Sequence, residues 1–292
     1  MLRRNLSIIL VIILSVLTFS ACNEKKELDL TVMSYNILFA FPNDNYDPWT
    51  ERKGYVSQII KSHDPDLIGL QEPLPWQVYD LKKLCPEYAS VNILLHTDST
   101  ILYKKDKFAP IEHRHYWLSP TPEKALSSGF GNFLPRYVIW AKFYHLDDGR
   151  EFYFINTHFD NTSPFQETAA PLFLERTAPL AAELPVIIAG DFNSVIGSEA
   201  FNILTDENSD FFLKDAYQIT ENHDIYNCDE GDCDDSTHSG GEGQIDHIFV
   251  AGKNVSCSLW GVDKLIYGDL QRPPSDHFAV VAKIRLPAIK SE

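Results

Sequence analysis

The sequence contains few basic residues for its length. It has 25 Lys and Arg against 41 Asp and Glu in 292 residues, a formal net charge of −16. A chain this acidic repels polyanions and lacks the broad basic surface on which nonspecific nucleic-acid binding depends. The shortage of basic residues therefore disfavours nucleic acid as the main partner, although it does not exclude a local basic groove. No segment of the sequence implies a protein partner.

Cysteine is also scarce, and internal repeats and low-complexity linkers are absent. None of the five cysteines has a spacing typical of a structural zinc site. Apart from Cys22, the four cysteines Cys85, Cys228, Cys233 and Cys257 allow three complete pairings, and the sequence does not choose among them. Cys228 and Cys233 are near enough in sequence to close a small loop, and an exported chain can oxidise its thiols.

The sequence has one long, predominantly apolar run, which lies at the N-terminus over residues 8–19. The run is too short for a comfortable membrane span. Basic residues precede it and small residues follow it, an order typical of a secretory signal peptide over residues 1–21. Cleavage would remove Arg3 and Arg4 and so shift the net charge by two, to −18.

The small residues directly before Cys22 resemble the lipobox of bacterial lipoproteins, with Phe19 where leucine is more usual. The resemblance implies that Cys22 is lipidated and that the protein is exported and anchored to a bacterial membrane, on its periplasmic or outer face. Ordinary cleavage and an uncleaved N-terminal anchor are the alternatives. Residues 22–27 would then form a short linker, and residues 28–290 would form one domain.

The rest of the sequence predicts an α/β fold. Apolar spacing predicts helices at 49–63, 74–84, 164–183 and 198–205, and Pro171 and Pro179 are expected to break or kink the third. Runs rich in β-branched and aromatic residues, separated by turn signals such as 147–150, predict strands. These runs are 28–36, 66–70, 90–95, 100–104, 108–118, 136–145, 151–158, 186–190, 244–250, 255–266 and 277–285. The order of elements favours two packed sheets flanked by helices.

The stretch VIIAGDFNSVIG, residues 186–197, ends a buried strand on two polar side chains. Residues two apart in a strand point to the same side, so Asp191 and Asn193 are expected to face one small ligand at a sheet edge. A simple turn is the alternative, because Asp and Asn both favour turns and helix caps.

Polar side chains recur in this way at six strand edges. They are Asn36, Glu72, Asn156, His158, Asp191, Asn193, Asp246, Asp276 and His277. Capping accounts for Asp and Asn but needs no Glu or His. Convergent carboxylates and amides suit a hard cation such as Mg²⁺, and two histidines suit acid–base work or stabilisation of a phosphoryl group. The set therefore predicts metal-assisted hydrolysis of a phosphate ester.

Six motifs in order carry a family resemblance. VMSYNIL, GLQE, INTHFD, GDFNS, QIDHIFV and SDHFAV resemble the motifs of the endonuclease/exonuclease/phosphatase superfamily over residues 30–285. The resemblance implies a four-layer α/β sandwich, with two mixed β-sheets packed face to face and flanked by helices. A further pattern, RK…PDLIGLQE…WLSPTP, which includes Arg52 and Lys53, is similar to exported bacterial members.

The resemblance also implies a centre for Mg²⁺ or Mn²⁺. Glu72 would be the main metal ligand with Asn36 beside it, and Asp276 would be a further ligand or a contact to the water of the metal. The donors are oxygens, which hard divalent cations prefer.

The same resemblance assigns catalytic roles. Asp191 would orient or deprotonate the attacking water, and Asn193 would donate its amide to a phosphate oxygen. Asp246 would hold His277 in one tautomer, and His277 would contact the phosphate. His158 would be the acid for the leaving oxygen.

Arg136 matches an arginine near the scissile phosphate of these relatives, whereas the partner of His158 is left open. Deoxyribonuclease-like relatives pair the corresponding histidine with a Glu, and the nearest residues here are Thr97 and Asp98. Either Asp98 serves from a position one residue out of register, or the pair is absent, since a one-residue slip in a strand turns the side chain to the other face.

Departures from the family motifs disfavour two of the functions known in this superfamily. Leu38 stands where relatives that cut at abasic DNA sites carry an acid, and His158 stands where they carry Tyr. The string QIDHI replaces the CDRI of the inositol-phosphatase branch. An abasic-site repair role and an inositol 5-phosphatase role are both disfavoured.

The leading hypothesis is a divalent-metal-dependent phosphodiesterase or phosphatase that acts on a small molecule or lipid headgroup outside the cytoplasm. A secreted nuclease is the alternative, since it would use the same centre. A binding module on an inactive fold is disfavoured, because binding alone does not require the full catalytic set. A structural calcium protein is also disfavoured, because the acidic loop CDEGDCDDS lacks the spacing of an EF-hand.

Overall fold

The computed structural model describes residues 26–41, 45–94, 96–132, 134–162, 164–228, 233–241 and 243–289. The signal peptide expected at 1–21 and the lipidation expected at Cys22 lie outside the described residues. None of the helices within these ranges is both long enough and apolar enough to cross a membrane.

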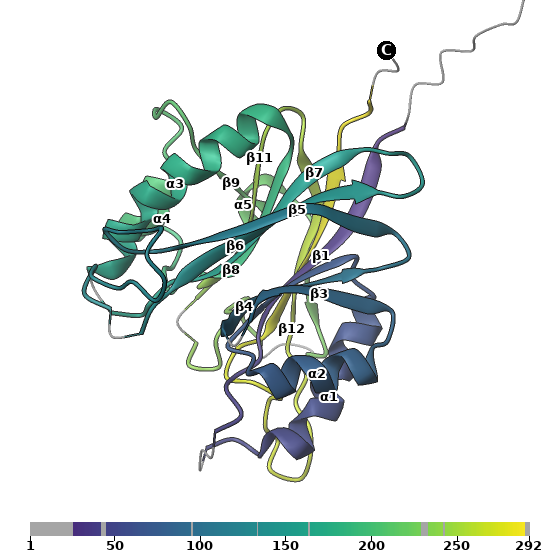
Figure 1. Ribbon diagram of the computed structural model, residues 1–292. Coiled ribbons are helices and arrows are strands. Elements are labelled where there is room, and N and C mark those ends of the chain that lie inside the picture. Colours follow the sequence, from purple (N-terminus) through teal and green to yellow (C-terminus); the bar gives the residue numbers. More distant parts are fainter. Residues whose placement is uncertain are drawn as a thin grey trace, which may run out of the picture.

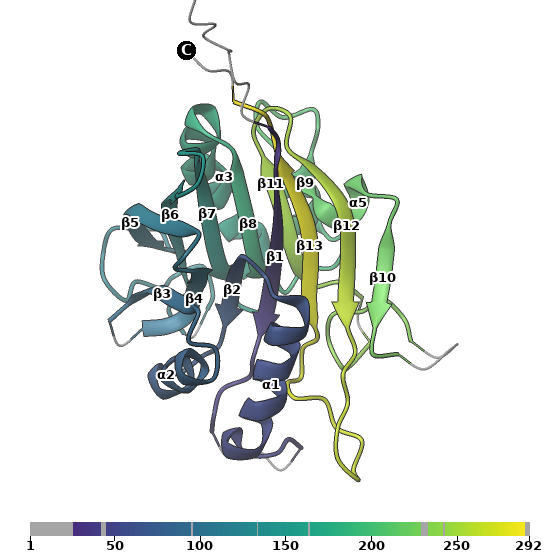
Figure 2. The same cartoon turned by 90° about the vertical axis from the view of Figure 1, so that its right-hand side faces the viewer.

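Two mixed β-sheets form the centre of the molecule (Figures 1 and 2). The seven-stranded sheet has the order β10 (His223–Tyr226), β12 (Ser256–Asp263), β13 (Ala279–Leu286), β1 (Leu28–Asn36), β2 (Leu67–Gln71), β4 (His96–Lys104) and β3 (Tyr88–Ile93). The six-stranded sheet has the order β5 (Phe108–Trp117), β6 (Tyr137–His145), β7 (Glu151–His158), β8 (Val186–Asp191), β11 (Asp246–Ala251) and β9 (Lys214–Asp215). The pairs β1–β2, β10–β12 and β7–β8 are parallel, and the other pairs are antiparallel.

The four longer described helices cover the outer faces of the two sheets (Figure 1). Helices α1 (Trp49–His63) and α2 (Pro75–Leu84) pack on the seven-stranded sheet, where they share one apolar cluster with β1 and β2. Helices α3 (Phe165–Glu183) and α4 (Glu199–Thr205) pack on the six-stranded sheet in a second cluster. The short helix α5 (Ala216–Ile219) follows β9. This arrangement confirms the predicted four-layer α/β sandwich.

Side-chain alternation along the strands produces the layers. In β1, Val32 lies in the cluster between the two sheets, and its neighbour Met33 lies in the cluster under α1 and α2. Neighbouring residues of a strand point to opposite faces, so a strand buried on both faces reads as a nearly continuous apolar run. The cluster between the sheets is rich in Phe, Ile and Val, including Phe143, Phe152 and Phe154.

A glycine permits close contact of the sheets beneath the polar strand ends. A Cβ atom at Gly69 of β2 would lie 2.6 Å from the Asn156 side-chain oxygen and 2.7 Å from the Ala189 Cβ atom of the other sheet. Asn156 connects the sheets at this point, since its amide donates hydrogen bonds to the carbonyls of Leu70 and Thr100, at 2.8 and 3.0 Å. Any larger residue at position 69 would push the sheets apart.

Helix α3 and the two shortest strands depart from the sequence prediction. Pro171 and Pro179 lie inside α3 without ending it, so the expected break does not occur. Both prolines are on the exposed side of the helix, while Phe173 and Thr177 are buried on the other. Packing of that buried side offsets the hydrogen bonds that proline cannot make. The prediction also missed β9, α5 and β10, which are too short for a periodic pattern.

The described residues contain one disulfide, so none of the three complete cysteine pairings is formed. Cys228 and Cys233 form a disulfide, whereas Cys85 and Cys257 are free and buried. The structure thereby supports the small loop that their spacing permits.

We expect Gly69→Ala to lower the free energy of unfolding by about 1–3 kcal/mol, the usual cost of overpacking a core. Gly54→Ala is the matched control, because a Cβ atom at Gly54 in α1 meets nothing within 4 Å. That change should raise the free energy of unfolding by about 0.5–1 kcal/mol through helix propensity. Urea denaturation of both variants measures the difference, and an equal effect of the two changes would contradict the account.

Candidate active site

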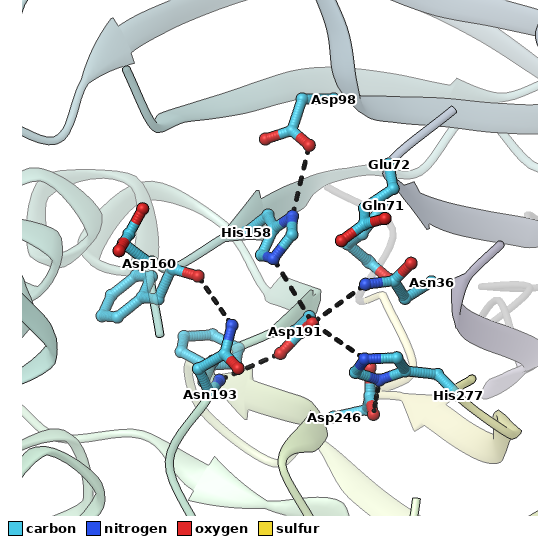
Figure 3. Close-up of polar contacts among 12 residues, drawn as sticks. Asn36, Gln71, Glu72, Asp98, His158, Asp160, Asp191, Asn193, Asp246 and His277 are labelled. Atoms are coloured by element: carbon cyan, nitrogen blue, oxygen red, sulfur yellow. Dashed lines mark hydrogen bonds and ion pairs between the residues drawn. The ribbon is translucent and has the colours of Figure 1, made fainter. Parts of the chain in front are cut away.

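Asp191, the last residue of β8, lies at the centre of the candidate site (Figure 3). Its Oδ2 accepts a hydrogen bond from the Asn36 amide at 3.1 Å. The same oxygen lies 3.4 Å from His158 Nε2 and 3.6 Å from His277 Nε2. Asp191 is 1% exposed. A buried carboxylate needs such partners, because an isolated buried charge is strongly unfavourable.

Strand register brings these residues together. Asp191 lies opposite His158 in the parallel β7–β8 pair and opposite Asp246 in the antiparallel β8–β11 pair. In the other sheet, Asn36 at the end of β1 lies opposite Gln71 at the end of β2. The strand ends therefore meet at one edge, as the sequence predicts.

His277 is held by two carboxylates. Its Nδ1 lies 2.8 Å from Asp246 Oδ2, and its Nε2 faces Asp191. The hydroxyl of Thr237 accepts hydrogen bonds from the backbone N–H groups of Ile245 and Asp246, which fixes the start of β11. This geometry agrees with the role expected for Asp246, because a hydrogen bond at Nδ1 determines which tautomer the ring adopts.

His158 has a matching arrangement on the other side of Asp191. Its Nδ1 lies 3.2 Å from Asp98 Oδ1 and 2.9 Å from Arg136 Nη1. The question that the sequence left open is thus resolved, since Asp98 does pair with His158. Two carboxylate–histidine pairs converge on one carboxylate.

Arg136 is 7% exposed and lies behind His158. Its guanidinium donates to Asp98 Oδ2 at 3.0 Å and to Asp160 Oδ2 at 3.3 Å. It therefore neutralises two carboxylates next to the histidine, and Asp160 is a site residue that the sequence prediction did not include. The expected contact of Arg136 with a phosphate stays a prediction.

Asn193 reaches the site by a turn rather than by strand alternation. Strand β8 ends at Asp191, and Asn193 adopts the left-handed conformation with φ 47°. The expectation that positions two apart share one face of a strand is therefore wrong here. The Asn193 backbone N–H donates to Asp191 Oδ1 at 3.0 Å, and its side-chain amide donates to the Phe159 carbonyl at 2.8 Å.

Charge coupling determines the protonation of the centre. Burial by itself lowers the pKa of His277, but the carboxylates of Asp246 and Asp191 outweigh it and raise that pKa to about 10. Burial and Arg136 lower the pKa of His158, whereas Asp98 and Asp191 raise it. The net effect is a pKa above the ordinary value of a histidine. Burial raises the pKa of Asp191, but the two histidines bring it below its usual range. Asp191 is therefore ionised between two histidines whose pKa values lie above the ordinary value.

Glu72, Asn36 and Asp276 form the acidic side of the site, where the sequence predicts a metal. Among the described ion pairs, none includes Glu72 or Asp276. Burial raises the pKa of Glu72, and His158 lowers it. Asp98 and Asp276 raise it further, so the pKa of Glu72 lies above its ordinary value. A carboxylate that is destabilised in this way, beside other oxygen donors, fits a hard divalent cation.

Glu72 is also held in an unusual backbone conformation. Its φ is 64°, which is uncommon for a residue with a side chain. Its N–H donates to the Asp98 carbonyl at 2.9 Å, and its Oε2 accepts from the Phe39 N–H at 3.1 Å. These bonds aim the carboxylate toward the site.

Among the described residues, two groups of three His or Asp side chains have ligand atoms within 4.8 Å of one another, and neither group includes Glu72. One is Asp191, Asp246 and His277, whose contacts are the hydrogen-bonded row described above. The other is His238, Asp276 and His277. The sequence prediction missed His238, which has no family motif residue beside it to mark it.

Arg52 of α1 holds the loops that carry the acidic side. It is 1% exposed, and its guanidinium donates to the carbonyls of Ile37, Leu38, Phe39 and Pro274. These segments flank Asn36 and Asp276, so Arg52 is a positioning residue. A charged residue at helical spacing from Trp49 and Val56, on the buried face of α1, is the sequence signal that identifies it.

We expect the contribution of His277 to stability to depend on pH in the metal-free protein. Its folded-state pKa of about 10 exceeds the unfolded value near 6.5, so the stabilisation is fully present below about pH 6.5 and is lost as pH rises through about 10. The difference in free energy of unfolding between wild type and His277→Gln should therefore shrink from pH 6 to pH 10. Urea denaturation in EDTA measures it, and a difference independent of pH would contradict the charge assignment.

Comparison with known proteins agrees with this geometry. The profile of the Endonuclease/Exonuclease/phosphatase family matches residues 33–277. A crystal structure of a family protein from Bacteroides thetaiotaomicron has a TM-score of 0.78 and 30% identity, and the match covers 89% of this chain and 98% of that one. A mannosyl-6-phosphatase from the same organism has a TM-score of 0.76 and 30% identity, over 87% of this chain and 99% of that one.

A curated relative matches over a shorter length. The CCR4-Not complex 3'-5'-exoribonuclease subunit Ccr4 of Schizosaccharomyces pombe is 30% identical over 135 residues. The match covers 39% of this chain and 20% of the yeast protein, so this chain spans about a fifth of the length of that relative.

Proposed function

Because the chain belongs to the endonuclease/exonuclease/phosphatase family, we propose that it is a divalent-metal-dependent phosphoesterase for a small molecule or lipid headgroup. The observation that carries the proposal is the ionised Asp191 between two carboxylate-supported histidines. The carboxylates of Glu72 and Asp276 lie next to it, and neither has a cationic partner among the described ion pairs. This combination meets the needs of phosphate-ester hydrolysis, in which a water is oriented and negative charge is stabilised.

In this proposal, each residue contributes from its observed position. Asp191 orients the attacking water, since its low pKa keeps it ionised. His277 and His158 offer N–H groups to oxygens that gain negative charge. The Asn193 amide has two hydrogens and gives one to Phe159, so the other is available to a phosphate oxygen.

Asn36, Glu72 and Asp276 would hold Mg²⁺ or Mn²⁺. A bound cation of this kind supplies Lewis-acid stabilisation of the phosphoryl oxygens. Arg52 and the Phe39 N–H keep the ligands in place through the bonds described above.

The net charge of −16 supports a small substrate over nucleic acid. The relative described as a mannosyl-6-phosphatase supports a small phosphate ester as well. A nuclease is the second candidate, since the yeast relative is described as a 3'-5'-exoribonuclease. An inactive binding module is the third, and the intact catalytic set argues against it.

A substrate panel tests the proposal. We expect the protein to hydrolyse p-nitrophenyl phosphate, bis-nitrophenyl phosphate or a choline phospholipid faster than DNA or RNA. EDTA should abolish activity, and Mg²⁺ or Mn²⁺ should restore it, because oxygen donors favour hard cations. Release of p-nitrophenol measures the two nitrophenyl esters, release of phosphocholine or choline measures the phospholipid, and release of acid-soluble nucleotides measures DNA and RNA. Full activity after exhaustive chelation would refute the metal, and a preference for DNA or RNA would favour the nuclease.

The Asp191→Asn variant tests whether Asp191 acts in catalysis or only stabilises the structure. We expect the variant to stay folded and to lose roughly 10²–10⁴-fold in kcat, the range of a general base or water-orienting group. The control is Asp215→Asn, which makes the same change in another buried aspartate, 3.2 Å from His247. The control should lose stability, and the folded fraction should keep wild-type turnover. Equal losses of turnover in both variants would mean that Asp191 is only structural.

The proposal also places the protein outside the cytoplasm, anchored by a lipid on Cys22. We expect Cys22→Ser to abolish partition into membranes, because the acyl chains would supply the affinity. Fractionation of cells that express each form measures this. Unchanged membrane partition of the variant would rule out the lipid anchor.

A further inference from the structure

A cavity of about 730 Å³ lies beside the candidate active site. Its lining includes His238, Ser239, Gln271, Ile266 and the Cys228–Cys233 disulfide. Pockets for small ligands have similar volumes, so the cavity is large enough for a substrate group beyond the phosphate.

His238 joins this cavity to the catalytic residues. Its backbone pairs with that of His277, and the centroids of the two rings are 4.9 Å apart. The Ser239 N–H donates to the Asp276 carbonyl at 2.8 Å, which fixes the two segments side by side. A phosphate ester at His277 therefore has its remaining part within reach of the cavity.

The hydrogen bonds of His238 make it a donor rather than a metal ligand. Its Nδ1 accepts a hydrogen bond from the Gly240 N–H at 3.0 Å. A neutral ring whose Nδ1 is an acceptor carries its proton on Nε2, and it then has no free lone pair for a cation. The closeness of His238 to Asp276 and His277 thus favours an oxygen of the substrate as its partner.

The charges of the lining favour an uncharged polar group. Lys264 lies in the lining, but Asp234 accepts from its ammonium at 3.3 Å, and the Ser236 carbonyl accepts from it at 2.5 Å. The described lining therefore has no unmatched cation to receive a second phosphate, as a nucleic-acid strand would require. Hydroxyl, amide and carboxylate groups at its rim suit hydroxyls, each of which donates and accepts.

We propose that this cavity binds the alcohol part of the substrate and that this part is polyhydroxylated, as in a sugar phosphate, with His238 donating to an ester or hydroxyl oxygen at the junction. The inference rests on the proposed phosphoesterase function. The inference adds the chemical class of the substrate and identifies the cavity as the part of the site that selects this class.

The test compares a hexose 6-phosphate with methyl phosphate, whose alcohol is too small to use the cavity. Ile266→Trp fills the cavity, and Ile111→Trp on β5 is the control, because the two isoleucines are 46% and 52% exposed and Ile111 is outside the cavity. Ile266→Trp should lower kcat/KM for the hexose phosphate by about ten-fold or more relative to methyl phosphate. Ile111→Trp should leave both values unchanged.

His238→Phe is the second variant, because it keeps an aromatic ring against His277 and removes the donor. We expect it to raise KM for the hexose phosphate more than it lowers kcat. Turnover of the hexose phosphate by the wild type, with no measurable turnover of methyl phosphate, also supports the cavity. Equal kcat/KM for the two wild-type substrates, or equal losses on both with Ile266→Trp, would overturn it. A wild type that hydrolyses no phosphate ester would refute the proposed function instead.

Discussion

The buried charge of Asp191 is the constraint on which the rest of the site depends. Its carboxylate is almost fully shielded from water and is stabilised by two histidines and the Asn36 amide. Each histidine carries a second carboxylate on its other nitrogen, Asp98 for His158 and Asp246 for His277. The carboxylates raise the pKa of both rings, and the rings lower the pKa of Asp191, because each charge lowers the cost of burying an opposite charge beside it.

The architecture follows from the need to bring these groups together. His158, Asp191 and Asp246 come from adjacent strands of one sheet, so register alone sets their distances. Asn36 and Asp98 come from the other sheet, and they reach Asp191 and His158 respectively because the sheets approach closely at Gly69. Arg52 then holds the loops after β1 and before β13 by their carbonyls. The packing of the two sheets therefore determines the geometry of the site.

The sequence predicts the layers and most of the strand-end residues, because both depend on local patterns. The strand pattern of β1 and the polar ends of β7 and β8 are visible in the sequence without any knowledge of contacts. The pairing of Asp98 with His158 is not visible, because it depends on how two sheets face each other. His238 is missed for a similar reason, since it lies in a loop and joins the site through one bridge to His277. The continuity of α3 through two prolines depends on tertiary packing that outweighs local propensity.

The measurement that tests the account most directly is an NMR titration of the His158 and His277 rings in the metal-free protein. The account predicts that both pKa values lie above the ordinary value of about 6.5 in the wild type. It also predicts that both fall in Asp191→Asn, because that change removes the charge that the two rings share. A ring that titrates at or below its ordinary value in the wild type, or pKa values that do not respond to Asp191→Asn, would contradict the central role of this carboxylate.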